Sequence, residues 1–544
     1  MRPHTFTRST VAVAVAVSVA SGLCAAPARA DEWGLDHFHD PFAAEDPTQQ
    51  PGLTLDGYFR TRGDLLHNLD LDRGPTPSTG ETLYPTPGLH PGKNDTLTSA
   101  NSRLRLIPRI SVGWEVNVYA MIDALDNVVL GSTPSDSTRT AAMNAASTAQ
   151  GAPKDSLKVK RAWAEIGTPI GLLAAGRMGA HWGMGVVAND GNSLDADLGN
   201  TVDAISLAVP LLSHIFGFGY EIASTGSTFD RGNGQAVDAD PADDVHSLSL
   251  AVLSMNTPAV ARIKHRDGRD TLDYGVVLSY RWQDYDYPQS QDGTVAPAAT
   301  AIKRGFTGLL ADAYGTWETP HNRLETEFAV LSAKLKDASL LAGLHTETIT
   351  ALQYGGVLRD TWQCMDKLAL SLETGLASGD SAPGFGVRSD RDRDRARKGD
   401  LDGPQVSLPD DTSVNNFRFH PDYHIDLILW REIVGTVTDA FYLRPKVVVS
   451  PGMGFTGEAA LVYSQAMEAT SAPGGKRPLG VEADFAVRYK SEDRFVLGLE
   501  YGVLQGLSGL DNPDASGGHP PGGVPIHLSA GIAQRVHATL GVLF

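Results

Sequence analysis

Arginines stand two residues apart in several stretches of this chain, as in GYFRTRGD and SRLRLIPR. Guanidinium groups stay charged in a wet environment and bind carboxylates or phosphates through paired hydrogen bonds. A row of them can form a track for anionic solutes, or it can brace a wall by pairing with neighbouring acids. The sequence leaves both readings open. The arginines of this pattern are Arg60, Arg62, Arg103, Arg105, Arg109, Arg161 and Arg177, and the acids expected beside them are Asp56, Asp64, Glu115, Asp123 and Glu165.

These arginines share one face only if the chain is extended, because successive side chains of a β-strand point to opposite sides. In SRLRLIPRI, Leu104, Leu106 and Ile110 form the apolar face opposite the arginines. The same alternation recurs in WEVNVYAMID, KLALSLETGL, VEADFAVRY and FVLGLEYGV. The pattern predicts a chain of many two-faced strands. The later strands present acids, namely Asp312, Glu318, Glu325, Glu327, Glu373 and Glu500.

The sequence ends on a long two-faced segment, HLSAGIAQRVHATLGVLF. Every second residue from Leu528 to Phe544 is apolar except Gln534, and the opposite face carries Arg535 and His537. We expect the apolar face to meet hydrocarbon and the polar face to meet a wet lumen. A terminal strand that ends in Phe resembles the recognition signal of bacterial outer-membrane barrels, and this likeness implies the barrel-assembly machinery as a partner.

The connections at the two ends of the predicted strands differ in length. Short links such as SVG, TPIG, TPHN and KSED follow one end, whereas the other end carries long polar links at 68–99, 126–155, 180–199, 225–245, 284–303, 379–421 and 506–524. Short periplasmic turns with long external loops are typical of outer-membrane barrels. A bilayer offers no water to an open strand edge, so the sheet must close. The predicted fold class is all-β: a transmembrane antiparallel β-barrel of about 16–18 strands.

The first thirty residues are typical of a cleaved signal peptide, with Arg2 and Arg8 before apolar VAVAVAVSVA and Ala-Arg-Ala at 28–30. Residues 31–51 are interpreted as a periplasmic lead-in and 52–544 as the barrel. The formal net charge of -19 disfavours nucleic acid as a partner. After cleavage only Cys364 remains, which excludes an intramolecular disulfide. The predicted location is the outer membrane of a Gram-negative cell.

One stretch, DYHIDLILWREIVGTVTDA at 422–440, decides the strand parity. As a strand it would make the number odd and place the two chain ends on opposite sides. As a helix it would bring Ile425, Ile428, Leu429 and Ile433 together at three- and four-residue spacing. We assign it to a long external loop, 379–440, in which residues around 415–440 fold inward and constrict the pore. The alternative is an ordinary strand.

Metal and enzyme motifs are weak. The acidic loops at 192–200, 238–246 and 407–413 could attract divalent cations, but none has the spacing of a calcium-binding loop. His37 and His39 lie in the lead-in, which we interpret as flexible. We therefore expect no metal site and no cofactor. The chain contains no HExxH, GxSxG, phosphate-loop or CxxC motif, so no catalytic residue and no enzyme activity is predicted. A hydrolase at the barrel rim would have to use His181, His420, Asp422 or His424.

Two resemblances add to this reading. The block VKRAWAEIGTPIGLLAAGRMGAHWGMG at 159–185 and ETGLASGD at 373–380 resemble substrate-specific and alginate-export-like porins. GYFRTRGDLLHNL, HWGMGVVANDGN and FHPDYHIDLILWREIVGTVTDA resemble an outer-membrane barrel family of myxobacterial type with no assigned function. The second likeness implies fold and location only. The acids of the later strands depart from the basic lumen of alginate exporters.

The sequence favours a porin-like channel for passive passage of small hydrophilic solutes, anionic or sugar-like ones among them. Its pore-lining residues would be Arg60, Arg62, Arg103, Arg105, Arg109, Arg161 and Arg177, with Glu165, Asp56 and Asp123 as counter-charges. Outer-membrane lipid and lipopolysaccharide are the expected surroundings. Two alternatives stay open: a non-conducting surface barrel for binding or adhesion, and a rim hydrolase.

Overall fold

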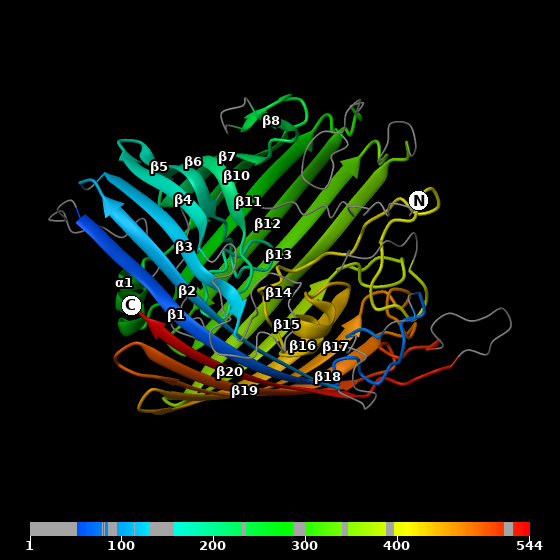
Figure 1. Ribbon diagram of the computed structural model, residues 1–544. Helices are drawn as coiled ribbons and strands as arrows, with labels where there is room; N and C mark the ends of the chain where they lie inside the picture. Colours follow the sequence, from blue (N-terminus) through cyan, green and yellow to red (C-terminus); the bar gives the residue numbers. More distant parts are fainter. Residues whose placement is uncertain are drawn as a thin grey trace, which may run out of the picture.

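A closed sheet of long antiparallel strands dominates the computed structural model (Figure 1). The structure describes residues 52–78, 80, 82–84, 95–113, 115–130, 157–230, 236–287, 301–339, 346–387, 396–515 and 526–544. The predicted signal peptide, the lead-in with His37 and His39, and parts of several long links lie outside these residues. Within them, 18 strands form one sheet, and β8 with β9 forms a separate two-stranded hairpin.

Each strand pairs with its neighbours in chain order, and β1 also pairs with β20, which closes the barrel. The first half of the wall comprises β1 (Gly52–His67), β2 (Thr96–Ser111), β3 (Val116–Val129), β4 (Leu157–Thr168), β5 (Gly171–Gly179), β6 (Thr201–Leu211), β7 (His214–Ser224), β10 (Val245–Ser254) and β11 (Thr271–Gln283). The second half comprises β12 (Phe306–Glu318), β13 (Asn322–Leu335), β14 (Ile349–Met365), β15 (Leu368–Ala377), β16 (Ala440–Gly452), β17 (Phe455–Ala466), β18 (Pro478–Lys490), β19 (Phe495–Gly506) and β20 (Ile532–Leu543). The predicted fold class is confirmed, at the upper end of the expected strand number.

The seam between β1 and β20 is held by charges as well as by the strand ladder. Asp64 accepts hydrogen bonds from Arg535 at 2.6 Å and from the His537 ring at 2.7 Å. Gly57 and Phe544 exchange two backbone hydrogen bonds of 3.0 Å each. The last residue of the chain therefore takes part in closing the sheet.

The two faces of the wall differ in the way that the alternation predicts. On β10, Leu248 and Leu250 are nearly half exposed, whereas Ser247 and Ser249 are buried on the inner side. Aromatic side chains stand outward near both ends of the strands: Tyr274, Trp317 and Trp362 near the short-turn end, and Tyr220, Tyr280 and Tyr354 toward the other. An apolar outer band between aromatic girdles is the architecture of an outer-membrane β-barrel. No helix within the described residues is long and apolar enough to span a membrane.

One connection at the short-turn end departs from the prediction of turns alone. Residues 258–266 form α1 (Pro258–Arg266), on the same side of the barrel as the C-terminus (Figure 1). Thr257 is the N-cap of this helix, because its side chain accepts a hydrogen bond from the Val260 backbone N–H. Thr followed by Pro is a recognised helix start, so the signal was present in the sequence.

We predict that Leu278→Arg, in the middle of the outward face of β11, lowers the free energy of unfolding by about 2–4 kcal/mol, because it places a charge in hydrocarbon. Leu278→Phe keeps the site apolar and is expected to change it by about 0.5 kcal/mol or less. Equilibrium unfolding of the refolded protein in lipid vesicles measures both. Equal stability of the two variants would contradict a lipid-facing position.

Candidate functional site

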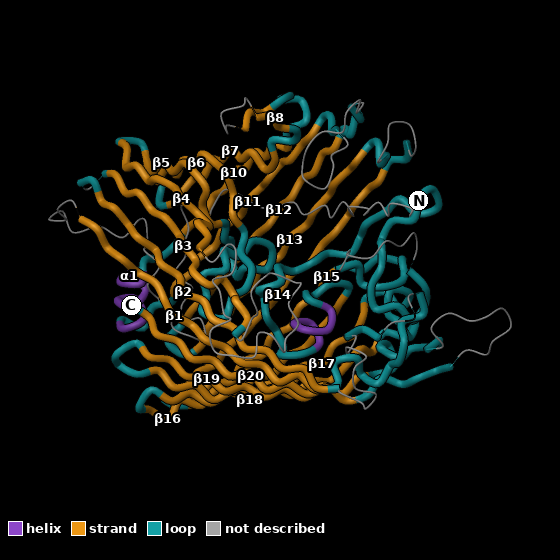
Figure 2. Tube along the Cα trace, viewed as in Figure 1, coloured by secondary structure: helices purple, strands orange, loops and turns teal. Residues whose placement is uncertain are grey.

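Two segments between strands enter the lumen. The first inward segment, residues 180–200, connects β5 to β6, and the second inward segment consists of the described residues 378–387 and 396–439 between β15 and β16. Figure 2 shows the short helix η2 (Leu429–Val434) of the second segment within the outline of the barrel. Both segments bury apolar side chains, among them Trp182, Val186, Trp430 and Ile433. The sequence predicts 180–199 as an external loop, whereas the structure folds this link inward and buries Trp182, Val186 and Leu194.

The arginines of β1, β2 and β4 bind backbone carbonyl groups of the first inward segment. Arg103 and Arg60 donate to the Ala196 oxygen at 2.8 and 3.2 Å, and Arg105 donates to the Gly191 oxygen at 2.8 Å. Arg161 donates to the Asn200 oxygen at 3.1 Å. All four side chains are buried. Four of the seven arginines predicted to line a path are therefore covered by the segment that they hold.

Acidic side chains neutralise the same arginines. Arg105 forms a two-pronged pair with Asp123, with nitrogen–oxygen distances of 2.7 and 2.8 Å. Arg62 contacts Asp195 of the inward segment at 3.0 Å. A hydrogen bond between two charged side chains stabilises the fold more than a hydrogen bond between neutral groups. It also offsets the free-energy cost of moving each ion out of water. Pairing and segment binding are thus parts of one network.

The remaining predicted site residues lie in different surroundings. Arg109 is half-buried on the inner face, where it donates to Asn117 at 3.2 Å. Glu165 is buried and accepts a hydrogen bond from the Trp163 ring at 3.0 Å. Asp56 is exposed near the beginning of β1.

Arg177 departs from the prediction that it faces the lumen. Its side chain is 57% exposed and pairs with Asp203 at 2.6 Å. On β5 the buried residues Ala174 and Met178 occupy the inner face, so Arg177 points outward near the far end of the strand. Apolar residues occur on both faces of GLLAAGRMG, and alternation alone could not orient this strand.

The wall opposite the arginines holds the first inward segment by its N–H groups. The Glu327 carboxylate on β13 accepts hydrogen bonds from the backbone of Val186 at 3.2 Å, of Val187 at 3.3 Å and of Met184. Trp182 packs edge-on against Tyr314 of β12, with ring centroids 5.1 Å apart. Cations on one side and a carboxylate on the other therefore bind opposite poles of the peptide groups.

The second inward segment combines an apolar cluster with hydrogen bonds that anchor residues 427–430 to the wall. Phe385, Phe419 and Trp430 are among its buried rings, and the Trp430 indole N–H donates to Ser464 on β17 at 2.9 Å. Glu482 on β18 accepts hydrogen bonds from the backbone of Leu427 at 2.9 Å and of Leu429 at 3.0 Å. Residues 422–439 contain η2 and no strand, so this stretch occupies part of the lumen and does not belong to the barrel wall.

The two segments contact each other inside the barrel. Arg431 pairs with Asp195 at 2.7 Å, and the Asp422 carboxylate accepts hydrogen bonds from the backbone of Asp197 at 3.0 Å and of Leu198 at 2.6 Å. The backbone N–H of His420 donates to the Val186 oxygen at 2.6 Å. These bonds hold the two inward segments together inside the barrel.

Burial sets the protonation of the ionisable groups at this contact. It lowers the pKa of His420 to about 4 and that of His424 to about 3, so both rings are neutral at pH 7. It raises the pKa of Asp422 to about 6. These are the residues that a rim hydrolase would need. Instead of facing solvent at the rim, they lie where the segments meet.

Sequence reasoning missed the cations that pair with the acids of the later strands. Arg323 contacts Glu325 at 2.7 Å, and Arg359 contacts Glu373 at 2.7 Å. The side chains of Arg323 and Arg359 are 25% and 31% exposed. Both lie toward the short-turn end of the inner wall, and the period-two pattern places each of them on the same face as the acids. A search for basic residues along those strands would have found them.

Comparison with known proteins adds little to this geometry. No family model matches the chain, and no curated protein sequence matches it. Solved structures that resemble it include OccK11 (OpdR) of Pseudomonas aeruginosa, at 10% identity over 90% of this chain and 96% of that one with a TM-score of 0.42. An anion-selective porin from Comamonas acidovorans matches at 11% identity over 91% and 100% with a TM-score of 0.38. OmpT, an outer membrane protein of Vibrio cholerae, matches at 11% identity over 92% and 98% with a TM-score of 0.35.

Values this low add nothing to the barrel architecture described above. The class of protein that the fold defines is an 18-stranded outer-membrane β-barrel. The likeness to a barrel family of myxobacterial type and to alginate-export-like porins stays a prediction.

We predict that Arg105→Ala frees the first inward segment, because it removes the hydrogen bond to the Gly191 oxygen and breaks the buried pair with Asp123, at a cost of about 3–5 kcal/mol. Arg177→Ala is the matched control, since it breaks an exposed arginine–aspartate pair worth about 1 kcal/mol or less. Limited chymotrypsin digestion of the folded barrel, with cleavage near Trp182 and Leu194, reports the release. Equal cleavage of the two variants would show that Arg105 does not hold the segment.

We also predict a pH dependence from Asp439, which accepts hydrogen bonds from Ser471 and from the Glu468 backbone at 2.8 Å. Burial raises the pKa of Asp439 to about 7. A raised pKa stabilises the folded state at low pH, and that contribution is lost as the pH rises from about 4 to about 7. The unfolding midpoint of the wild type should therefore fall more between pH 5 and pH 8 than that of Asp439→Asn. Identical profiles would contradict this.

Proposed function

We propose that this protein is a narrow porin-like channel for passive passage of small hydrophilic solutes across an outer membrane. The observation that carries the proposal is the inner wall, which presents partly exposed charged pairs inside a closed, lipid-facing barrel. Water-exposed charge in a barrel lumen is the usual lining of a diffusion path, and the inward segments restrict its width.

The exposed charges fall at both ends of the inward segments. Arg323 and Arg359 lie toward the short-turn end, while Lys160 and Asp197 are 38% and 39% exposed toward the other end. Each of these side chains is paired with a charge of the opposite sign, Arg323 with Glu325 and Arg359 with Glu373 at one end, Lys160 with Asp126 and Asp197 with Arg62 at the other. Such a lining favours small polar or zwitterionic solutes, sugar-like ones included, over strong selection for anions.

Planar-bilayer recording tests the proposal. The wild type should give small, stepwise single-channel currents, and replacement of residues 184–198 by a short Gly-Ser linker should increase the conductance several-fold because it empties part of the lumen. Heat-modifiable migration on a gel shows that each variant has folded. Currents that are absent from both proteins would contradict a channel.

A matched pair of variants tests the lining. Arg323→Gln should shift the reversal potential in a salt gradient toward cation selectivity, and Glu325→Gln should shift it toward anion selectivity, because the two side chains form one partly exposed pair. Both variants leave the inward segments untouched. Unchanged selectivity in both would place these residues away from the path.

A second candidate is a non-conducting surface barrel. It is favoured by the contacts that join the two inward segments across the lumen, through Arg431 with Asp195 and Asp422 with the backbone of Leu198. For that function the wild type would be silent in a bilayer, whereas the linker variant would conduct.

A further inference from the structure

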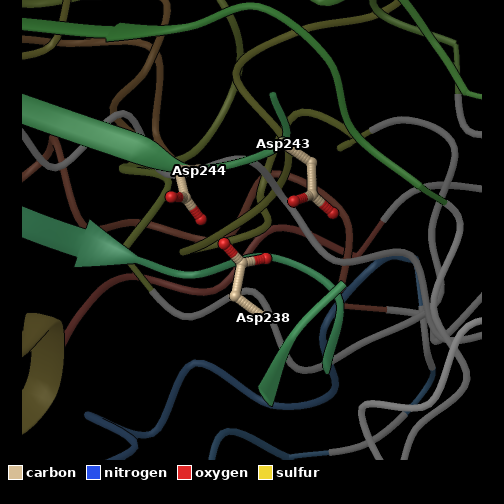
Figure 3. A group of neighbouring side chains, drawn as sticks. All are labelled: Asp238, Asp243 and Asp244. Carbon is tan, nitrogen blue, oxygen red and sulfur yellow. The ribbon is translucent and has the colours of Figure 1, made fainter. Parts of the chain in front are cut away.

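Three carboxylates converge where the β8–β9 hairpin leads into β10. The hairpin consists of β8 (Thr228–Asp230) and β9 (Ala236–Asp238), and it stands at the end of the barrel opposite the short turns. Asp238 ends β9, and Asp243 with Asp244 precedes β10. Their carboxylate oxygens lie within 4.8 Å of one another. Figure 3 shows the three side chains directed toward a common space.

The burial of two of these acids is what distinguishes the group from ordinary loop charges. Asp243 is 1% exposed and Asp244 is 7% exposed. One carboxylate oxygen of each, Oδ1, is buried without a hydrogen-bond partner. Buried polar atoms are nearly always satisfied, and a carboxylate without a partner is especially costly. A cation would satisfy these oxygens and would also offset the repulsion between the neighbouring acids.

The surrounding chain holds the carboxylates in place. The other oxygen of Asp243 accepts hydrogen bonds from the backbone N–H and the hydroxyl of Ser227, at 2.8 and 2.6 Å. The Gln283 side chain donates to the Asp243 backbone oxygen at 3.0 Å. A Cβ at Gly226 would lie 2.3 Å from the Asp243 carboxyl carbon, so this position requires glycine. The loop is thus built around Asp243.

The one nearby basic side chain among the described contacts of the group does not neutralise it. His246 lies 3.9 Å from Asp244, beyond hydrogen-bond distance, and is a cation only when protonated. Among the described residues, three acids therefore face each other with at most one compensating charge.

We infer that Asp238, Asp243 and Asp244 bind a divalent cation of the calcium type. An all-oxygen, carboxylate-rich group is the donor set that Ca²⁺ prefers, and one such ion would satisfy both unpartnered oxygens at once. The sequence lacks the fixed spacing of a calcium-binding loop. The site arises only when the end of β9 folds back against the start of β10, which explains why the sequence predicted none.

The site fastens the hairpin to the barrel. Its ligands come from both ends of the 239–242 link, so a bound ion ties β9 to β10 and stiffens this part of the rim. Loops of this kind on outer surfaces bind Ca²⁺ with dissociation constants of about 10⁻⁴–10⁻³ M. The proposal is independent of conduction through the lumen.

Calorimetric titration of the folded full-length barrel in detergent, after treatment with a chelator, with CaCl₂ as the only added ligand, tests this inference. The wild type should bind one equivalent with a dissociation constant of about 10⁻⁴–10⁻³ M, and Asp243→Asn and Asp244→Asn should each weaken binding at least tenfold. Asp267→Asn removes one exposed acid near α1 and is the charge-matched control, with unchanged affinity expected.

Heat-modifiable migration on a gel identifies any variant that has not folded. Should Asp243→Asn fail to fold, Asp238→Asn together with Asp244→Asn still tests the site. The absence of saturable Ca²⁺ binding to the wild type, or equal loss of affinity in Asp267→Asn and the cluster variants, would overturn the assignment.

Discussion

The structure depends on the pairing of buried charged side chains inside a closed barrel. Arginines on β1, β2 and β4 would be unstable if they were buried alone, and they are stabilised by Asp123 and by the carbonyl groups of residues 180–200. Removing either partner leaves an uncompensated ion in a place with little water. The wall and the first inward segment therefore require each other, and the shape of the lumen follows from that mutual requirement.

This constraint also explains how the second segment is placed. Its helix η2 carries Arg431 toward Asp195, so the first segment supplies the counter-charge for the second. Glu482 and Glu327 bind backbone N–H groups of the two segments from separate strands. Polar side chains of the wall thus make the hydrogen bonds to backbone N–H groups that water would otherwise make. Apolar rings of the inward segments fill the remaining space inside the barrel. A channel with this interior is shaped by its loops more than by its strand number.

The sequence predicted the wall better than it predicted the lumen. Period-two alternation and link lengths depend on local chemistry, and they identified the closed sheet and the inner face for Arg60 and Arg105. These arginines also donate to backbone oxygens more than eighty residues away, Gly191 and Ala196, which no side-chain pattern records. The apolar residues Trp182 and Leu194 were the sequence signal that the link at 180–199 is buried and not external. The carboxylate group at Asp243 was equally hidden, because three acids at irregular spacing meet only after a hairpin folds.

Hydrogen exchange read by mass spectrometry tests the central claim most directly, at the backbone amides of residues 184–187 in the folded barrel. Three of these amides donate to the buried Glu327 carboxylate. The account predicts slow exchange, comparable with that of the barrel strands, at Met184, Val186 and Val187. Exchange as fast as in an exposed loop would show that the segment does not occupy the lumen and that the arginines are held by other means.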